Sequence, residues 1–191
     1  AIIISNNDSV LNERTEKVLL KYKIMLLLKK YFFKKEVKYM RVVIKVGTST
    51  LAYENTGLLH IRRMKQLCEV LSDIKNAGHE VILVSSGAIG MGMGKLGLDS
   101  KPHDLPGKQA CAAIGQCELM YTYDSLFSQY NHIVGQILIT KADIENDDRK
   151  TNFINTMEHL LKRNVLPIVN ENDTISTYEI EFGDNDTLSA V

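Results

Sequence analysis

The chain has 191 residues, of which 45% are hydrophobic and 24% charged, and its formal net charge is zero. This length and composition suit one domain with a buried core. The charge is uneven, because residues 1–40 carry nine Lys and Arg against four Asp and Glu, whereas the remainder carries fourteen against nineteen. No basic patch runs through the main body, which argues against nucleic acid as a partner of this segment.

The apolar run near the start of the chain is not expected to enter a membrane. Residues 24–28 form a stretch far shorter than the roughly 20 residues that cross a bilayer. Lysines interrupt the surrounding sequence and no small-residue cleavage site follows, which excludes a secretion signal. The odd number of cysteines fits a reducing compartment. We therefore expect a cytoplasmic protein without membrane contact.

Residues 1–39 are interpreted as an extension, either disordered or translated from DNA upstream of a start codon at Met40. Codons for Lys35-Glu36-Val37 can contain a bacterial ribosome-binding sequence, correctly spaced ahead of Met40. The nucleotide sequence tests this hypothesis, and a basic amphipathic surface helix is the alternative. Residues 40–191 then hold the folded domain, which we expect to be incomplete because Thr187–Val191 stops just inside an apparent helix.

From Arg41 onward, the pattern alternates between strands and helices. A β-branched run ends at Gly47, a helical spacing of apolar residues ends at Gly78, and a second apolar run follows. The expected strands are 41–46, 81–84, 133–140 and 165–169, the expected helices are 58–77, 108–129 and 152–163, and 175–182 is an expected hairpin. This order predicts an α/β fold with a mainly parallel sheet between helices.

The cysteines and histidines give no metal pattern. Cys68, Cys111 and Cys117 fall on expected helices and are interpreted as buried, reduced thiols. The five histidines are scattered without the spacing of metal ligands. We therefore predict no protein-held metal site.

Ligands of open α/β sheets bind beyond the carboxyl ends of the strands, and the first expected strand ends in chemistry-bearing residues. Lys45 lies inside an apolar strand, where its charge is costly without a partner. Gly47, Thr48 and Ser49 follow, and glycine lets the backbone approach a phosphate. A lysine that simply reaches solvent is the alternative.

A second turn, Ser86-Gly87-Ala88, joins the second strand to a helix. Backbone N–H groups at such a helix start can bind an anion, although a plain tight turn is the alternative. The run Gly92–Gly97 matches G-x-G-x-x-G, but it does not directly follow a strand. We therefore reject it as a dinucleotide-binding fingerprint.

Two further turns crowd amides and carboxylates together at Asn170–Asp173 and Asp184–Asp186. Such groups suit a zwitterion, because Asp accepts from an ammonium group and Asn donates to a carboxylate. Helix capping and ordinary turn chemistry are the alternatives. Together with the lysine and the glycine turn, these turns predict phosphate chemistry beside an amino-acid site.

These segments resemble the amino acid kinase family, and within it the members that phosphorylate free glutamate. The matching segments are Val43–Ser49, Ser86–Ile89, Gly135–Thr140, Pro167–Asp173 and Gly183–Ala190. The resemblance begins near Arg41 and implies the family's three-layer fold. Residues 40–191 then form the N-terminal, glutamate-binding part of the kinase domain, incomplete at its C-terminus.

The resemblance implies transfer of the ATP γ-phosphoryl group to the side-chain carboxylate of L-glutamate, giving γ-glutamyl phosphate for proline synthesis. Lys45 would neutralise charge on the transferring group, and Asp186 would orient that lysine. Mg²⁺ would bind through the nucleotide phosphates. The implied glutamate-binding residues are Ser86, Asp173 and Asn185, with Asn170, Gly87 and Ala88 nearby. Proline as feedback inhibitor and a homo-oligomer of the full-length protein are also implied.

The family's second catalytic lysine and its adenine-binding segments lie beyond Val191, so we expect no turnover by residues 1–191 alone.

Several alternative functions stay open. An aspartokinase or acetylglutamate kinase type, a uridylate or carbamate kinase, a kinase fused to a reductase, and a non-catalytic amino-acid sensor are the rivals. Asp173 favours free glutamate, because an N-acylated substrate has no ammonium group for it to bind.

Overall fold

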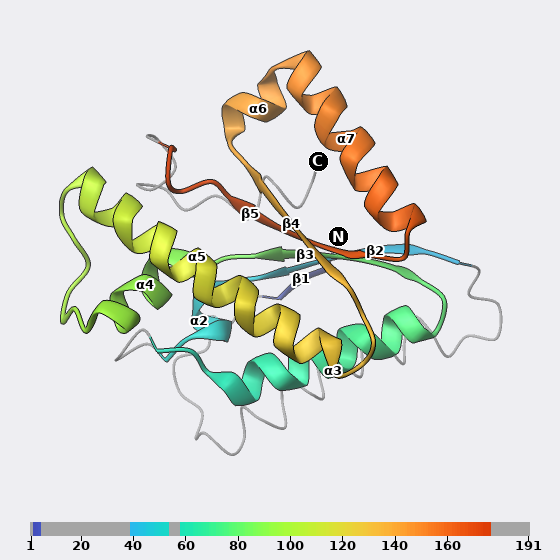
Figure 1. The fold of residues 1–191 in the computed structure, drawn as a ribbon, viewed down its shortest axis with the longest axis horizontal. Helices are drawn as coiled ribbons and strands as arrows, with labels where there is room; N and C mark the ends of the chain where they lie inside the picture. The colour runs from blue at the N-terminus through green and yellow to red at the C-terminus, as the bar shows by residue number, and fades with distance from the viewer. Residues whose placement is uncertain (1, 5–38, 54–57, 177–191) are drawn as a thin grey trace.

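The computed structural model describes residues 2–4, 39–53 and 58–176. Within these ranges the chain forms a five-stranded, all-parallel sheet in the order β1-β2-β3-β5-β4 (Figure 1). The strands are β1 (Ile2–Ile4), β2 (Arg41–Val46), β3 (Glu80–Ser85), β4 (Val134–Ile139) and β5 (Leu166–Glu171). The predicted parallel α/β fold is confirmed.

Helices connect the strands and cover the sheet. They are α2 (Thr48–Leu51), α3 (Ile61–Asn76), α4 (Ala88–Leu96), α5 (Leu105–Ser128), α6 (Lys141–Glu145) and α7 (Asp147–Lys162). The short helices α2 and α6 were not predicted, because neither is long enough to show a helical period. No helix of the described residues is both long and apolar enough to span a bilayer.

Two long helices begin earlier than their hydrophobic periodicity predicted, because polar caps start them. Helix α5 begins at Leu105, where the Asp104 carboxylate accepts a hydrogen bond from the N–H of Gly107 at 2.9 Å. Helix α7 begins at Asp147, where the Asn146 side chain accepts from the N–H of Arg149 at 2.9 Å. Such caps satisfy N–H groups that lack intrahelical partners.

The direction of each crossover decides which face a helix covers. Connections between parallel strands are nearly always right-handed. From β2 through β3 to β4 the chain moves one way across the sheet, whereas from β4 to β5 it moves back. Helices α3 and α5 therefore lie on one side of the sheet and α7 on the other (Figure 1).

Strand β3 is buried on both faces and divides the interior into two cores. Val81 and Leu83 belong to the core beneath α3 and α5, whereas Ile82 and Val84 belong to the core beneath α7. Side chains alternate across a strand, so a continuous apolar run fills both layers. The larger core also contains the fully buried, stacked rings of Tyr123 and Phe127. The apolar run at the start of β3 therefore reflects its central position.

The first strand is the part of residues 1–39 that the structure places in the sheet. Ile2–Ile4 pairs in parallel with β2, with Ile2 opposite Ile44 and Ile4 opposite Val46. Residues 5–38 lie outside the described ranges. The interpretation of residues 1–39 as an extension therefore stays a prediction.

The three cysteines differ in their environments. Cys68 is fully buried, and burial raises the pKa of its thiol to about 12. Cys111 is also buried, whereas Cys117 is exposed on α5. The prediction of buried thiols is thus confirmed for two positions and wrong for Cys117, because helical position alone does not tell which face is covered.

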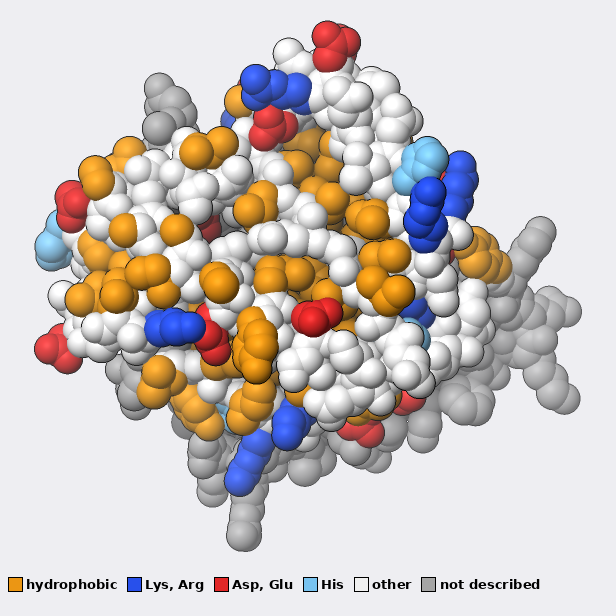
Figure 2. Space-filling view, in the orientation of Figure 1, with side chains coloured by type: hydrophobic (Ala, Val, Ile, Leu, Met, Phe, Trp, Pro, Cys, Tyr) orange, Lys and Arg blue, Asp and Glu red, His pale blue; other side chains and the backbone are white. Residues whose placement is uncertain are grey.

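Hydrophobic side chains gather on the face of the molecule that α5 crosses, with few charged side chains among them (Figure 2). Tyr121 of α5 is 71% exposed and Ile133, just before β4, is 67% exposed. Apolar surface of this kind is common at protein contacts. Self-association of the full-length protein stays a prediction.

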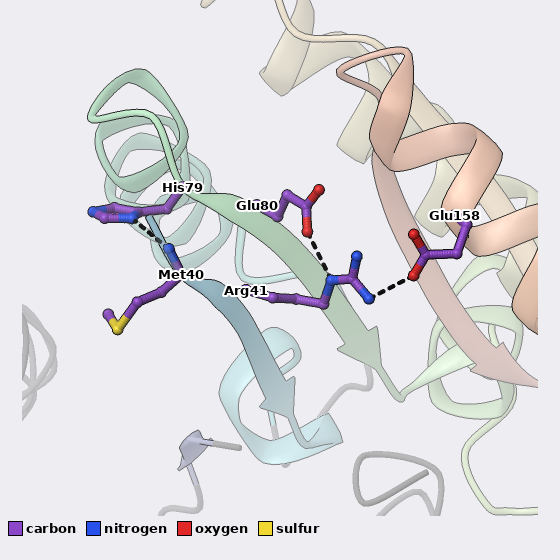
Figure 3. Close-up of polar contacts among 5 residues, drawn as sticks. All are labelled: Met40, Arg41, His79, Glu80 and Glu158. Atoms are coloured by element: carbon purple, nitrogen blue, oxygen red, sulfur yellow. Dashed lines mark hydrogen bonds and ion pairs between the residues drawn. The ribbon is translucent and has the colours of Figure 1, made fainter. Parts of the chain in front are cut away.

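Arg41, at the amino end of β2, joins this strand to β3 and to helix α7. Arg41 of β2 donates from Nε to Glu80 of β3 and from one terminal nitrogen to Glu158 of α7, each at 2.7 Å (Figure 3). The neighbouring Met40 N–H donates to Nδ1 of His79 at 3.3 Å. Three elements are therefore joined at the amino ends of the strands.

This network makes stability depend on pH. Burial raises the pKa of Glu80, but hydrogen bonds from Tyr39 and Arg41 outweigh it, so the pKa lies below its ordinary value of 4.5. A carboxylate with a depressed pKa stabilises the fold above its ordinary pKa and loses that contribution as pH falls through the depressed value. We expect Glu80→Gln to lower the unfolding free energy at pH 7 by less than about 1 kcal/mol, because the Arg41 side chain is 43% exposed.

Denaturant unfolding of the parent protein and of Glu80→Gln, at several pH values from 7 to below 4.5, measures the difference between their unfolding free energies. We expect this difference to shrink in acid. The matched control is Glu145→Gln, at an exposed carboxylate 3.9 Å from Lys141. A Glu80→Gln difference that stays constant across this pH range would contradict the assignment.

Candidate active site

The strand register brings the predicted site turns to one edge of the sheet. Lys45 of β2 lies opposite Val84 of β3, which in turn lies opposite Val169 of β5. The Ser86 N–H donates to the carbonyl of Val46 at 3.1 Å, which extends the β2–β3 pairing into the turn. The carboxyl ends of β2, β3 and β5 therefore lie side by side, where the fold class places ligands.

The Ser86-Gly87-Ala88 turn starts a helix in a conformation that favours glycine. Gly87 is the N-cap of α4 with φ of 102°, in the left-handed region that side chains rarely adopt. The first N–H groups of a helix have no acceptor within it, and the helix dipole favours a negative charge there. The start of α4 is therefore suited to an anion such as a phosphate or carboxylate.

The Gly47-Thr48-Ser49 turn packs against the Ser86–Ala88 turn. Helix α2 begins directly after Gly47, and a Cβ placed on Gly87 would lie 3.6 Å from the Thr48 methyl carbon. A Cβ on Gly90 would lie 3.5 Å from the same methyl carbon. The two glycine-containing turns, which are 38 residues apart between Thr48 and Ser86, thus form one surface.

Lys45 projects from a different face of the sheet than its buried neighbours. Val42, Ile44 and Val46 alternate into the core beneath α3 and α5. Lys45 therefore shares the opposite face of β2 with Arg41, whose partner Glu158 lies on α7. The structure brings Lys45 to the same sheet edge as the Ser86 turn, but on the α7 side.

Asn170 is held by the protein itself. Its side chain is 1% exposed, and its Nδ2 donates to Oε1 of Gln116 on α5 at 2.8 Å. Its Oδ1 accepts from the N–H of Glu171 at 2.9 Å. The amide is therefore fixed in one orientation at the end of β5.

The turn after β5 carries Asp173. The carbonyl of Asn172 accepts from the N–H groups of Ile175 and Ser176 at 3.1 and 3.0 Å, which closes the turn. Thr174 also donates to the Asn172 side chain. Asp173 is half-buried within this closed turn, at the same edge as the α4 start. The remaining predicted residues, Asn185 and Asp186, lie outside the described residues.

The rejected glycine motif has a packing explanation. Gly92 lies within α4, where an added Cβ would fall 1.9 Å from the carbonyl oxygen of Cys111 on α5. Gly115 of α5 is equally close, since its Cβ would fall 1.7 Å from the carbonyl oxygen of Ala88. These glycines let α4 and α5 cross at backbone distance. The run Gly92–Gly97 lies within α4 and at its C-cap, so it does not directly follow a strand, as expected from the sequence.

The donor set of this edge suits phosphate groups better than a bare metal ion. Across residues 39–53 and 58–176, no group of three or more His, Cys, Asp or Glu side chains is placed to hold a metal. The α4 start and Lys45 instead offer N–H groups and a positive charge.

Comparison with known proteins agrees with this geometry. The model of the amino acid kinase family matches residues 40–191. The chain belongs to the amino acid kinase family. It is 54% identical over 155 residues to the glutamate 5-kinase of Clostridium perfringens, covering 79% of this chain and 57% of that protein. It is 54% identical over 151 residues to that of Moorella thermoacetica, covering 79% of this chain and 40% of that protein. The glutamate 5-kinase of Symbiobacterium thermophilum is 52% identical over 150 residues, which cover 78% of this chain and 57% of that protein.

The chain spans about half the length of these curated relatives, between 40% and 57%. The predicted resemblance to the amino acid kinase family, which rested on short motifs, is thereby confirmed.

Sequence reasoning missed the residues of α5 that contact this candidate site. Gln116 bonds Asn170, and the hydroxyl of Tyr123 lies 2.9 Å from the Ser85 hydroxyl at the end of β3. The sequence carries one signal of them, because Gln109, Gln116 and Tyr123 recur every seven residues along α5. This spacing puts them on one side of the helix.

The α4–α5 crossing gives a direct test of how the α4 start is positioned. We expect Gly115→Ala to lower the unfolding free energy by about 1–3 kcal/mol, because the new methyl group would overlap the Ala88 carbonyl and push the helices apart. Urea unfolding measures this. Gly90→Ala is the control, because its methyl group would meet only the Thr48 side chain at 3.5 Å. Equal stability of both variants and the parent would contradict the close crossing.

Proposed function

We propose that the complete protein transfers the γ-phosphoryl group of ATP to the side-chain carboxylate of L-glutamate. The products are γ-glutamyl phosphate and ADP, and the reaction is the first step of proline biosynthesis. The observation that carries the proposal is the meeting of the Gly47–Ser49, Ser86–Ala88 and Asn170–Asp173 turns at one sheet edge. The relatives that share about half of this sequence are named for the same activity.

The chemistry requires charge stabilisation more than proton transfer. An oxygen of the glutamate carboxylate forms a bond to the γ-phosphorus while the bond to the leaving oxygen of ADP breaks, and no proton has to move. Protein groups act by positioning and by balancing charge on the transferring group. Lys45 supplies a positive charge and the α4 start supplies N–H donors, while Asp186 is proposed to orient the lysine. Mg²⁺, bound to the nucleotide phosphates, supplies further charge neutralisation.

Recognition of free glutamate is assigned to the amide- and carboxylate-bearing turns. The Asp173 carboxylate accepts from the substrate ammonium group, and the Ser86 side chain and the Gly87 and Ala88 N–H groups donate to its carboxylates. Asn170 and Asn185 complete this set. An N-acylated amino acid has no ammonium group, so Asp173 favours a free amino acid. Proline inhibition and a homo-oligomer remain predictions of the resemblance, and a cytoplasmic location remains a prediction from the missing targeting signals and the odd cysteine count.

The decisive experiment uses the complete gene product and traps an acyl phosphate with hydroxylamine. L-Glutamate, L-aspartate and N-acetyl-L-glutamate are offered with ATP and Mg²⁺. We expect product from glutamate, at least about 100-fold lower kcat in Lys45→Ala, and about tenfold higher glutamate KM in Asp173→Ala. Lys65→Ala, at an exposed lysine on α3, is the matched control and should leave both constants unchanged.

Other results of this assay would support a different substrate or a non-catalytic function. Product from aspartate or N-acetylglutamate instead of glutamate would keep phosphoryl transfer and reassign the substrate turns. Binding of glutamate without product from any acceptor would replace the enzyme by an amino-acid sensor.

A further inference from the structure

Three polar side chains form a stripe along the buried side of α5. Gln109, Gln116 and Tyr123 are spaced seven residues apart within α5. Seven residues turn an α-helix by about 700°, so successive members differ in direction by about 20° and all three side chains leave the helix within about 40° of one another. We call these three residues the α5 stripe.

Each member of the α5 stripe contacts a different part of the candidate site. Gln109 donates from Nε2 to the carbonyl of Ser176 at 3.3 Å, at the end of the turn that carries Asp173. Gln116 accepts from Asn170 at 2.8 Å, at the beginning of the same turn. Tyr123 bonds the Ser85 hydroxyl at 2.9 Å, next to the turn that starts α4. One helix thus contacts both ends of the turn after β5 and the residue that precedes the Ser86–Ala88 turn.

Packing alone does not explain a glutamine at position 116. Gln116 is 8% exposed and lies between the buried residues Cys111 and Leu119 on the same helix. A polar group in such a place costs free energy unless it is hydrogen-bonded. Its Oε1 is used by Asn170, whereas its Nε2 has no hydrogen-bond partner among the residues that the structure describes. An apolar side chain of similar size would therefore fill this space without leaving a buried N–H group unsatisfied.

The hydrogen bond from Asn170 to Gln116 fixes the orientation of the Asn170 side chain. With Nδ2 bonded to Gln116 and Oδ1 bonded to the Glu171 N–H, the carboxamide cannot rotate without breaking a buried hydrogen bond. Its second N–H and its remaining lone pair then have set directions. Without the Gln116 oxygen, one of the two anchors is lost.

We propose that Gln116 is a positioning residue for substrate recognition, acting through Asn170. It holds the start of the Asn170–Ser176 turn, and Gln109 holds the end of the same turn. This inference rests on the proposed function, because it assigns Gln116 to the glutamate side of that reaction. It names a residue that touches no reacting atom and contributes through the orientation of one amide.

The test is a double-mutant cycle on the complete gene product with the hydroxylamine assay. Gln116→Met keeps a side chain of similar length and removes the acceptor, whereas Gln116→Glu keeps an acceptor oxygen for Asn170. We expect Gln116→Met to raise the glutamate KM about tenfold while the ATP KM stays within about twofold, and Gln116→Glu to recover part of the loss. The matched control is Gln129→Leu, at an exposed glutamine whose Nε2 bonds only Ser125 within the same helix.

Coupling with Asn170 decides the mechanism. If Gln116 acts through Asn170, the double variant Gln116→Met/Asn170→Ala has the same glutamate KM as Asn170→Ala alone. Effects that multiply, or an unchanged KM in Gln116→Met, would overturn the inference. If Gln116→Met yields no folded protein, Gln109→Met replaces it, with an expected KM increase of about threefold from the loss of the Ser176 contact and no increase as the contradicting result.

The assay distinguishes a failure of the proposed function from a failure of the role of Gln116. An unmodified protein that makes no acyl phosphate from glutamate refutes the proposed function and the role of Gln116 with it. An active protein whose Gln116 variants behave like the Gln129 control refutes the role of Gln116 alone.

Discussion

The close crossing of α4 and α5 is the contact on which the candidate site depends. Gly92 and Gly115 have no room for a Cβ, so the two helix backbones meet directly. This contact sets where α4 begins relative to α5, and the start of α4 is the predicted anion site. Because α5 also bonds Asn170 and Ser176, its position is transmitted to the turn after β5. One helix therefore sets the distance between the start of α4 and the turn after β5.

The order of the strands explains why these turns meet at all. The chain crosses from β3 to β4 and returns to place β5 between them, so that β5 lies beside β3. The carboxyl end of β5 therefore comes next to Ser85, although Ser85 and Asn170 are 85 residues apart in the sequence. The same return puts α7 on the opposite face, where Arg41 reaches Glu158. Helices thereby cover both faces of the sheet (Figure 1).

Much of this arrangement could be predicted from the sequence, because apolar runs and helical spacing report burial directly. The parallel sheet, the Ser86–Ala88 turn and the rejection of Gly92–Gly97 followed from such patterns. The contact between Gln116 and Asn170 could not be predicted, because the partner of a polar residue in a helix is known only once the partner strand is placed. The exposure of Cys117 was missed for a similar reason, since only the packing of α5 decides which of its sides is covered.

We propose that glutamate binds between the start of α4 and the turn after β5. A crystal structure of the complete protein with L-glutamate and a non-hydrolysable ATP analogue would locate the substrate. We expect glutamate between the Gly87 and Ala88 N–H groups and the Asp173 carboxylate, with the terminal phosphate facing Lys45. Glutamate bound away from the carboxyl ends of β3 and β5, with these turns unchanged, would contradict it.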